Sequence, residues 1–105
     1  MALTKDFKDT VRARALRNPK FRQALLEESV ESFLSGDLDT GKALLRDYIN
    51  ATIGFEKLAK VTDKSSKSLM RMFSHEGNPR ADNIFSIIGT LQKKEGIELH
   101  VHTVR

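Results

Sequence analysis

The stretch that decides the fold lies at 55–80 and reads FEKLAKVTDKSSKSLMRMFSHEGNPR. Apolar residues at helical spacing predict one short helix over about 55–61 and a second over about 66–74. Between them Asp63 occupies a turn that requires a left-handed backbone, which Asp tolerates better than most residues. Ser65 is a suitable N-cap for the second helix. Two short helices joined by such a turn are the arrangement of a helix-turn-helix.

The second predicted helix has an apolar side and a polar side. The side chains expected to face the core across both helices are Phe55, Leu58, Ala59, Leu69, Met72 and Phe73. The outward and N-terminal positions hold Ser65, Ser66, Lys67, Ser68, Met70 and Arg71. Lys67 and Arg71 are four residues apart on one face and can reach phosphate oxygens or guanine edges. Short hydroxyls at a helix N-terminus also suit phosphate. The alternative is a solvated basic stripe on a helical bundle.

The loop that follows, Glu76-Gly77-Asn78-Pro79, is rich in turn-forming residues. Arg80 beside it is a candidate phosphate clamp, with an ordinary surface charge as the alternative. The predicted DNA-binding residues are therefore Ser65, Ser66, Lys67, Ser68, Arg71, Asn78 and Arg80.

The charge distribution is uneven along the 105 residues. The chain carries 18 Lys and Arg against 14 Asp and Glu, a net charge of +4 with neutral histidines. Residues 57–80 hold six basic side chains against two acidic ones, and residues 1–20 hold the same excess. Residues 21–50 hold three basic side chains against six acidic ones. The basic excess therefore coincides with the predicted helix pair, which suits a polyanion partner.

The rest of the chain is predicted to be helical, so the fold class is all-α. Asn18-Pro19 is a start signal, and apolar residues recur at steps of three and four up to Gly36. Asp37 or Asp39 can cap a second helix that ends before Gly54. A last helix begins near Asp82 or Asn83 and is closed by Gly96. Residues 18–96 form one helical domain in this interpretation, and residues 1–17 are either a basic arm or a helix.

The C-terminal segment changes its period. Ile97, Leu99 and Val101 alternate with Glu98, His100 and His102, which is typical of a half-buried strand. A strand over 97–105 has no partner in its own helical domain. We expect two copies of the chain to pair these strands across a dimer axis, with a frayed end as the alternative.

Several function classes are disfavoured by composition. The chain has no cysteine, so disulfides, thiolate zinc sites and cysteine nucleophiles are excluded and a cytoplasmic location is expected. No apolar run approaches the roughly 20 residues of a spanning helix, and the N-terminus lacks the apolar core of a secretory signal. His100 and His102 lack a third metal ligand. We expect no enzymatic activity, no cofactor and no membrane partner.

The sequence resembles the addiction-module antidote proteins, the HigA-type antitoxins of the Xre/lambda-repressor-like helix-turn-helix family. The residues that carry the resemblance span about 18–101: Asn18-Pro19-Lys20-Phe21, Gly36-Asp37, Ala43-Leu44-Leu45-Arg46-Asp47, Leu58-Ala59, Ser65, Leu69-Met70-Arg71, Gly77-Asn78-Pro79-Arg80 and Gly96-Ile97-Glu98-Leu99. The resemblance implies a lambda-repressor-like fold with its recognition helix at 65–73. It also implies a homodimeric repressor of its own operon that neutralises a small RelE/ParE-like toxin. Asp63, Lys64 and Met72 depart from the residue types usual in that family.

The function predicted from the sequence is sequence-specific binding of double-stranded DNA by a repressor, the antitoxin of a type II toxin-antitoxin module. A two-fold dimer would place two recognition helices in successive major grooves, about 34–36 Å apart. The alternatives are a phage- or mobile-element-type regulator without a toxin partner and a helical protein-interaction module.

Overall fold

A computed structural model describes residue 10 and residues 13–105 of the chain. Residues 13–17 are helical and precede α2 (Pro19–Leu34), α3 (Leu38–Ala51), α4 (Phe55–Thr62), α5 (Ser66–Met72) and α6 (Ala81–Glu95). No strand occurs within the described residues. The expected all-α fold is confirmed for them, whereas the expectation for residues 1–17 lies largely outside them.

Short polar side chains and glycines set the ends of the helices as predicted. The Asn18 side chain accepts a hydrogen bond from the Phe21 amide at the start of α2, and Asp37 accepts one from the Thr40 amide at the start of α3. Hydrogen bonds from the Thr40 side chain and from the Thr40 amide lower the pKa of the Asp37 carboxyl. Gly96 ends α6 with a φ of +75°, a left-handed conformation that glycine adopts without steric cost.

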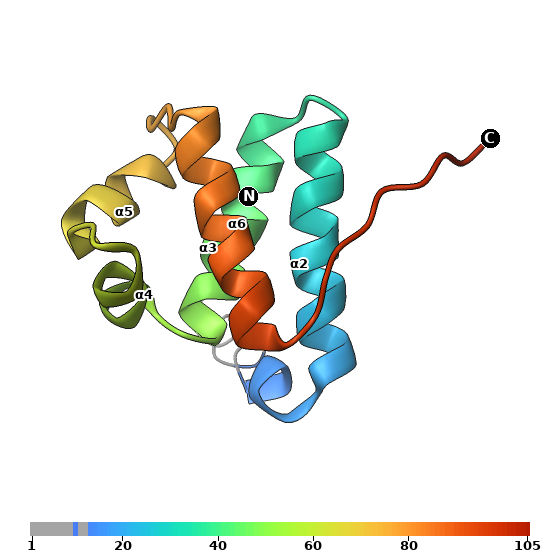
Figure 1. The fold of residues 1–105 in the computed structure, drawn as a ribbon, viewed down its shortest axis with the longest axis horizontal. Coiled ribbons are helices and arrows are strands. Elements are labelled where there is room, and N and C mark those ends of the chain that lie inside the picture. The colour runs from blue at the N-terminus through green and yellow to red at the C-terminus, as the bar shows by residue number, and fades with distance from the viewer. Residues whose placement is uncertain (1–9, 11–12) are drawn as a thin grey trace.

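The core draws on all five helices. Figure 1 shows α2 and α3 side by side, α6 in front of α3, and α4 and α5 together at one side of the bundle. The buried side chains that form one cluster are Leu26, Leu45, Tyr48, Ile49, Phe55, Leu58, Leu69, Phe73, Ile84, Ile87, Ile88 and Leu91. Because α4 and α5 contribute Phe55, Leu58 and Leu69, and Phe73 follows directly as the C-cap of α5, the helix pair is anchored in the same core as the rest of the bundle.

A polar network ties the lower ends of three helices together. The Tyr48 hydroxyl of α3 donates to Glu95 Oε1 of α6 at 2.6 Å, and Arg22 Nε of α2 donates to the same carboxylate at 3.1 Å. Arg22 Nη1 also donates to the Ala15 carbonyl at 2.7 Å. Burial and the Glu95 carboxylate raise the pKa of the Tyr48 hydroxyl, so Tyr48 remains a donor.

The predicted C-terminal strand over 97–105 is not seen in the described single chain. These residues leave α6 as an extended tail that runs along α2 and then away from the body (Figure 1), without β-ladder hydrogen bonds. A ladder requires a second strand, and the described residues supply none. The predicted alternation does hold at the start of the tail, because Ile97 and Leu99 are half-buried against the core while Glu98 and His100 are exposed.

Two helix boundaries also differ from the prediction. α5 ends at Met72 rather than near Ser74, because Phe73 already leaves the helix as its C-cap and turns into the core. α6 begins at Ala81 rather than at Asp82 or Asn83. Within the described part of the chain, no helix is both long and apolar enough to cross a membrane.

Candidate nucleic-acid interface

The turn between α4 and α5 has the predicted backbone. Asp63 adopts the left-handed conformation, with φ +57° and ψ +36°, as the C-cap of α4. It is the one non-glycine residue with positive φ in the described part of the chain. Ser65 then caps α5, its hydroxyl accepting from the Ser68 amide at 3.0 Å. Both predictions for this turn are confirmed.

Packing on the core fixes which side of the helix pair faces outward. Leu58 of α4 and Leu69 of α5 are fully buried. The rings of Phe55 and Phe73 lie 6.3 Å apart at a tilt of 45°. With these four side chains held inward, and with Ala59 and Met72 half-buried against the same core, the opposite side of the helix pair faces solvent.

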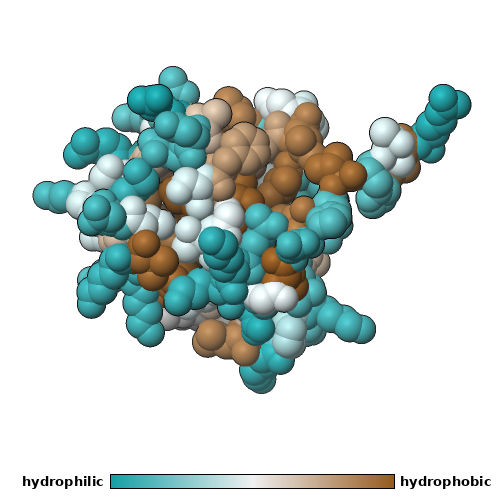
Figure 2. Space-filling model, in the orientation of Figure 1, coloured by the Kyte–Doolittle hydropathy of each residue, from teal (hydrophilic) through white to brown (hydrophobic). Residues whose placement is uncertain are grey.

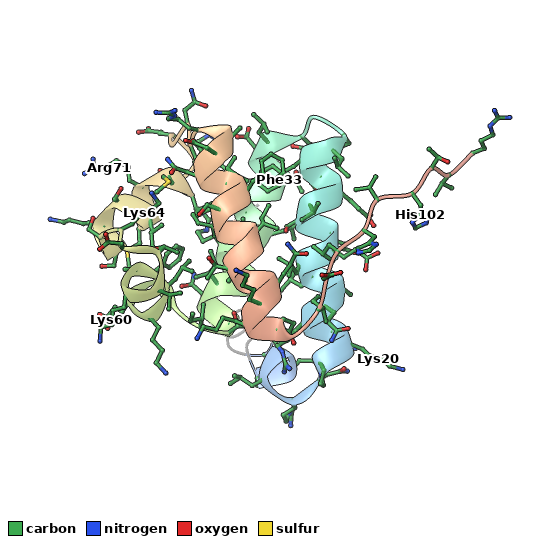
Figure 3. The ribbon with its side chains drawn as sticks, in the orientation of Figure 1. Lys20, Phe33, Lys60, Lys64, Arg71 and His102 are labelled. Atoms are coloured by element: carbon green, nitrogen blue, oxygen red, sulfur yellow. The ribbon has the colours of Figure 1, made fainter. Side chains whose placement is uncertain are left out.

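The outward side of α4 and α5 is cationic. Its basic side chains, called here the cationic side, are Lys57, Lys60, Lys64, Lys67 and Arg71, of which all but the half-buried Lys64 are exposed. Figure 3 shows Lys60, Lys64 and Arg71 at the side of the molecule formed by α4 and α5, away from α2. Figure 2 shows largely hydrophilic surface over the same side. No ion pair to an acidic side chain within the described residues neutralises these five cations.

The structure brings part of the predicted site to one hollow. Ser68 and Arg71 of α5 and Asn78 of the following loop line a surface depression of about 530 Å³, together with Glu76. Ser65, Lys67 and Ser68 are exposed along α5, while Ser66 is half-buried. Ser65 uses its hydroxyl as the cap, which leaves lone-pair capacity on the oxygen for a second contact.

Arg80 lies apart from that hollow. Its side chain is 81% exposed, and its Nε lies 3.4 Å from Asp82 Oδ1. An exposed pair of this kind contributes little to stability, so Asp82 holds Arg80 only weakly. Arg80 remains accessible to a phosphate, but it is not grouped with Ser68, Arg71 and Asn78.

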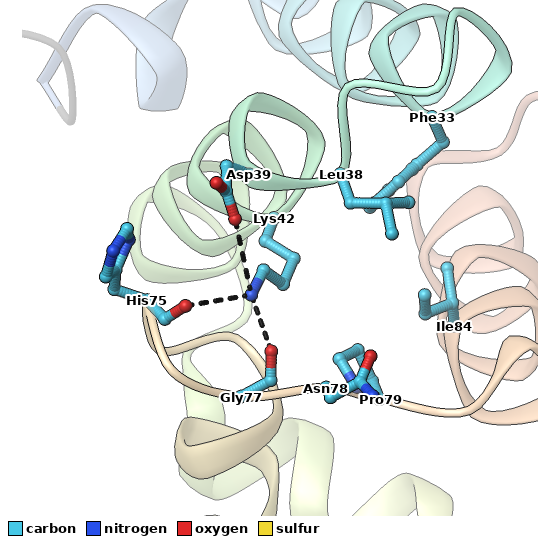
Figure 4. A pocket seen from close by; sticks show the side chains of 9 residues that line it. All are labelled: Phe33, Leu38, Asp39, Lys42, His75, Gly77, Asn78, Pro79 and Ile84. Atoms are coloured by element: carbon cyan, nitrogen blue, oxygen red, sulfur yellow. Dashed lines mark hydrogen bonds and ion pairs between the residues drawn. The ribbon is translucent and has the colours of Figure 1, made fainter.

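Sequence reasoning missed Lys42, the residue that shapes the loop carrying Asn78. The Lys42 side chain of α3 is 8% exposed, and its ammonium donates to the carbonyls of Gly77 at 2.6 Å and His75 at 3.3 Å (Figure 4). It also donates to the Ser74 carbonyl at 3.1 Å. Asp39 Oδ1 lies 3.8 Å from the same ammonium. A lysine within an otherwise amphipathic helix looks solvated in the sequence, and only its position near the buried face of α3 hinted otherwise.

The same loop needs a residue without a side chain at position 77. A Cβ on Gly77 would collide with the backbone oxygens of Arg71 and Met72 at the end of α5. Arg46 of α3 adds a further anchor, since its Nη1 donates to the Phe73 carbonyl at 3.1 Å. Two cations of α3 and one glycine therefore set the path from α5 to α6.

The histidines gather no ligand set. His100 Nε2 lies 3.1 Å from Glu98 Oε2 on the exposed tail, and His75 lies in the loop after α5. Among the residues that the structure describes, no group of three or more His, Asp or Glu side chains is arranged to hold a metal ion.

Comparisons of the chain with protein-family models, with curated proteins and with solved structures find no significant match.

Proposed function

We propose that the protein is a sequence-specific DNA-binding repressor whose α4 and α5 form a helix-turn-helix, with α5 entering the major groove. The observation that carries the proposal is the cationic side on two short helices whose other faces are locked in the core. The left-handed turn at Asp63 and the Ser65 cap give these helices a fixed relative orientation. A rigid cationic helix pair is what recognition of a duplex requires.

The position of each basic side chain on α4 or α5 indicates which part of the DNA it would contact. Lys57, Lys60 and Lys64 on α4 and the turn are suited to phosphate oxygens, which position a protein without reading sequence. Lys67 and Arg71 share the outward face of α5, where a guanidinium or an ammonium can meet guanine N7 and O6. Asn78 borders the same hollow as Arg71 and offers an amide to a base or phosphate. In this proposal the protein binds DNA without catalysing a reaction. It acts in the cytoplasm.

The proposal includes a two-fold dimer and a protein partner, an RNA-cleaving toxin of the RelE/ParE-like class. The resemblance to HigA-type antitoxins supports the toxin. The alternative is a regulator without a toxin partner, and in that case the proposed DNA binding by α4 and α5 is the same.

Salt-dependent binding to duplex DNA tests the proposal with a matched control. We expect Lys57→Ala combined with Lys60→Ala to weaken binding to a 40-base-pair duplex of mixed sequence and to reduce the slope of log K against log salt by about 2, one per lost phosphate contact. Lys93→Ala combined with Lys94→Ala removes the same charge from the last turn of α6 and should leave that slope unchanged. Equal slopes for the two double variants would contradict the proposal, provided both keep the wild-type helical circular dichroism.

A further inference from the structure

The tail, residues 97–105, has one occupied backbone edge and one free edge. The Leu99 amide donates to Gln92 Oε1 of α6 at 2.7 Å. In an extended chain, alternate residues direct their N–H and C=O groups to opposite edges. The backbone groups of Glu98, His100 and His102 therefore lie on the other edge, and they make no hydrogen bond to any residue that the structure describes.

An apolar stripe between α2 and the tail is incompletely covered. It lies in a groove of about 490 Å³, with Val30 and Leu34 on one wall and Leu99 and Val101 on the other. The charged and polar side chains that also line the groove are Glu27, Glu31, Glu98, His100 and His102. Leu34 is 62% exposed and Val101 is 77% exposed. In Figure 2, apolar surface reaches the region where the tail leaves the body. An exposed edge beside an exposed apolar stripe is a site for strand addition.

We propose that the tail of a second copy of this chain fills this groove, pairing antiparallel along the free edge with the two-fold axis at His100. The inference names the contact surface of the dimer proposed above and rests on that dimer. Because the free edge belongs to the even-numbered residues, even residues must face even residues across the axis. An axis that falls between two residues is thereby excluded.

The facing side chains distinguish the register with its axis at His100 from those with the axis at Leu99 or Val101. With the axis at His100, Glu98 faces His102 of the other copy, and Leu99 faces Val101. With the axis at Val101, Glu98 would instead face Val104, and His100 would face His102. With the axis at Leu99, pairing would span only residues 97–101 rather than 97–103. The axis at His100 gives a longer ladder than the axis at Leu99, and its facing side chains match in polarity from 98 to 102, although Ile97 then faces Thr103.

Two strands alone make a marginal structure in water, so the apolar stripe is a necessary part of the interface. In this register the odd-numbered side chains of both tails lie on the side that faces α2, where Leu34 remains exposed. The even-numbered side chains lie on the outer, solvated side. Dimerisation thus covers Leu34 and Val101 while leaving the cationic side of each copy free.

The absence of cysteine from the chain permits a direct test by disulfide trapping. Directly facing residues of an antiparallel pair have Cα atoms about 5.5 Å apart or closer, within the range of a disulfide. We expect full-length His100→Cys to form a covalent dimer under mild oxidation. We also expect Glu98→Cys mixed with a mass-tagged His102→Cys to form the mixed dimer. Glu98→Cys alone should not link, since its two copies would lie about 13 Å apart.

Each outcome decides the proposal. Faster linking of His100→Cys than of the exposed control His75→Cys, together with the mixed dimer, supports it. No linking, equal rates at all positions, or preferential linking of Glu98→Cys with His100→Cys would overturn it. Leu34→Glu provides a second readout: we expect at least a tenfold weaker dimer by analytical ultracentrifugation, and no change for Leu16→Glu. A chain that links as expected but binds no duplex DNA would contradict the proposed function alone.

Discussion

Asp63 directs the chain from α4 into α5 through a left-handed backbone that costs free energy for any residue with a Cβ. We expect Asp63→Gly to raise the free energy of unfolding by up to about 1 kcal/mol, because glycine adopts this conformation without strain. Asp63→Val should lower it by about 1 kcal/mol or more, since β-branching makes positive φ worse. Urea denaturation of the three proteins measures the order. A valine variant as stable as the glycine variant would show that the turn is not strained.

Asp37 links the stability of α3 to pH. Hydrogen bonds from Thr40 lower the pKa of its carboxyl, so the stabilisation is complete above the unfolded value of about 3.9 and is lost as pH falls through the lower folded value. We expect the melting temperature of the wild type to drop relative to that of Asp37→Asn between pH 5 and pH 2.5, because Asn caps comparably without titrating. A constant difference between the two melting temperatures over that range would contradict this expectation.

At the scale of elements, α3 holds the loop between α5 and α6 through Lys42. We expect Lys42→Met to lower the free energy of unfolding by about 2–3 kcal/mol, because the carbonyls of Ser74, His75 and Gly77 lose a charged donor. Amide hydrogen exchange in the segment 73–78 should accelerate at the same time. Lys60→Met, on the exposed side of α4, should change the stability by no more than about 0.5 kcal/mol. Equal effects of the two substitutions would contradict the assigned role of Lys42.

The elements that could be predicted from the sequence are those set by local chemistry. Caps such as Asn18, Asp37 and Ser65 act on amides three residues away, so each is visible in a short window of sequence. The turn at Asp63 was predictable for the same reason. The contact of Lys42 with Gly77 joins residues 35 positions apart, and no local pattern indicates it. The strand over 97–105 was expected from a correct alternation, but a strand also requires a partner that the single chain does not supply.

At the scale of the whole molecule, the charges are sorted onto different elements. The cationic side lies on α4 and α5, while the exposed acids Glu27, Glu28 and Glu31 lie on α2. On and beside α4 and α5, five cations outnumber the exposed carboxylates of Glu56, Asp63 and Glu76. The tail lies along α2, away from that side (Figure 1). The net charge of +4 by itself did not distinguish this arrangement from an evenly basic surface.

Selection of duplexes from a random-sequence DNA library by the full-length protein tests the central claim most directly. We expect enrichment of a two-fold symmetric site whose half-sites are centred about 10 base pairs apart, bound at least about 10³-fold more tightly than mixed-sequence DNA. The Lys67→Ala, Arg71→Ala double variant should lose that preference. A library that emerges without an enriched motif, or with affinities equal to those for mixed-sequence DNA, would contradict sequence-specific recognition by α5.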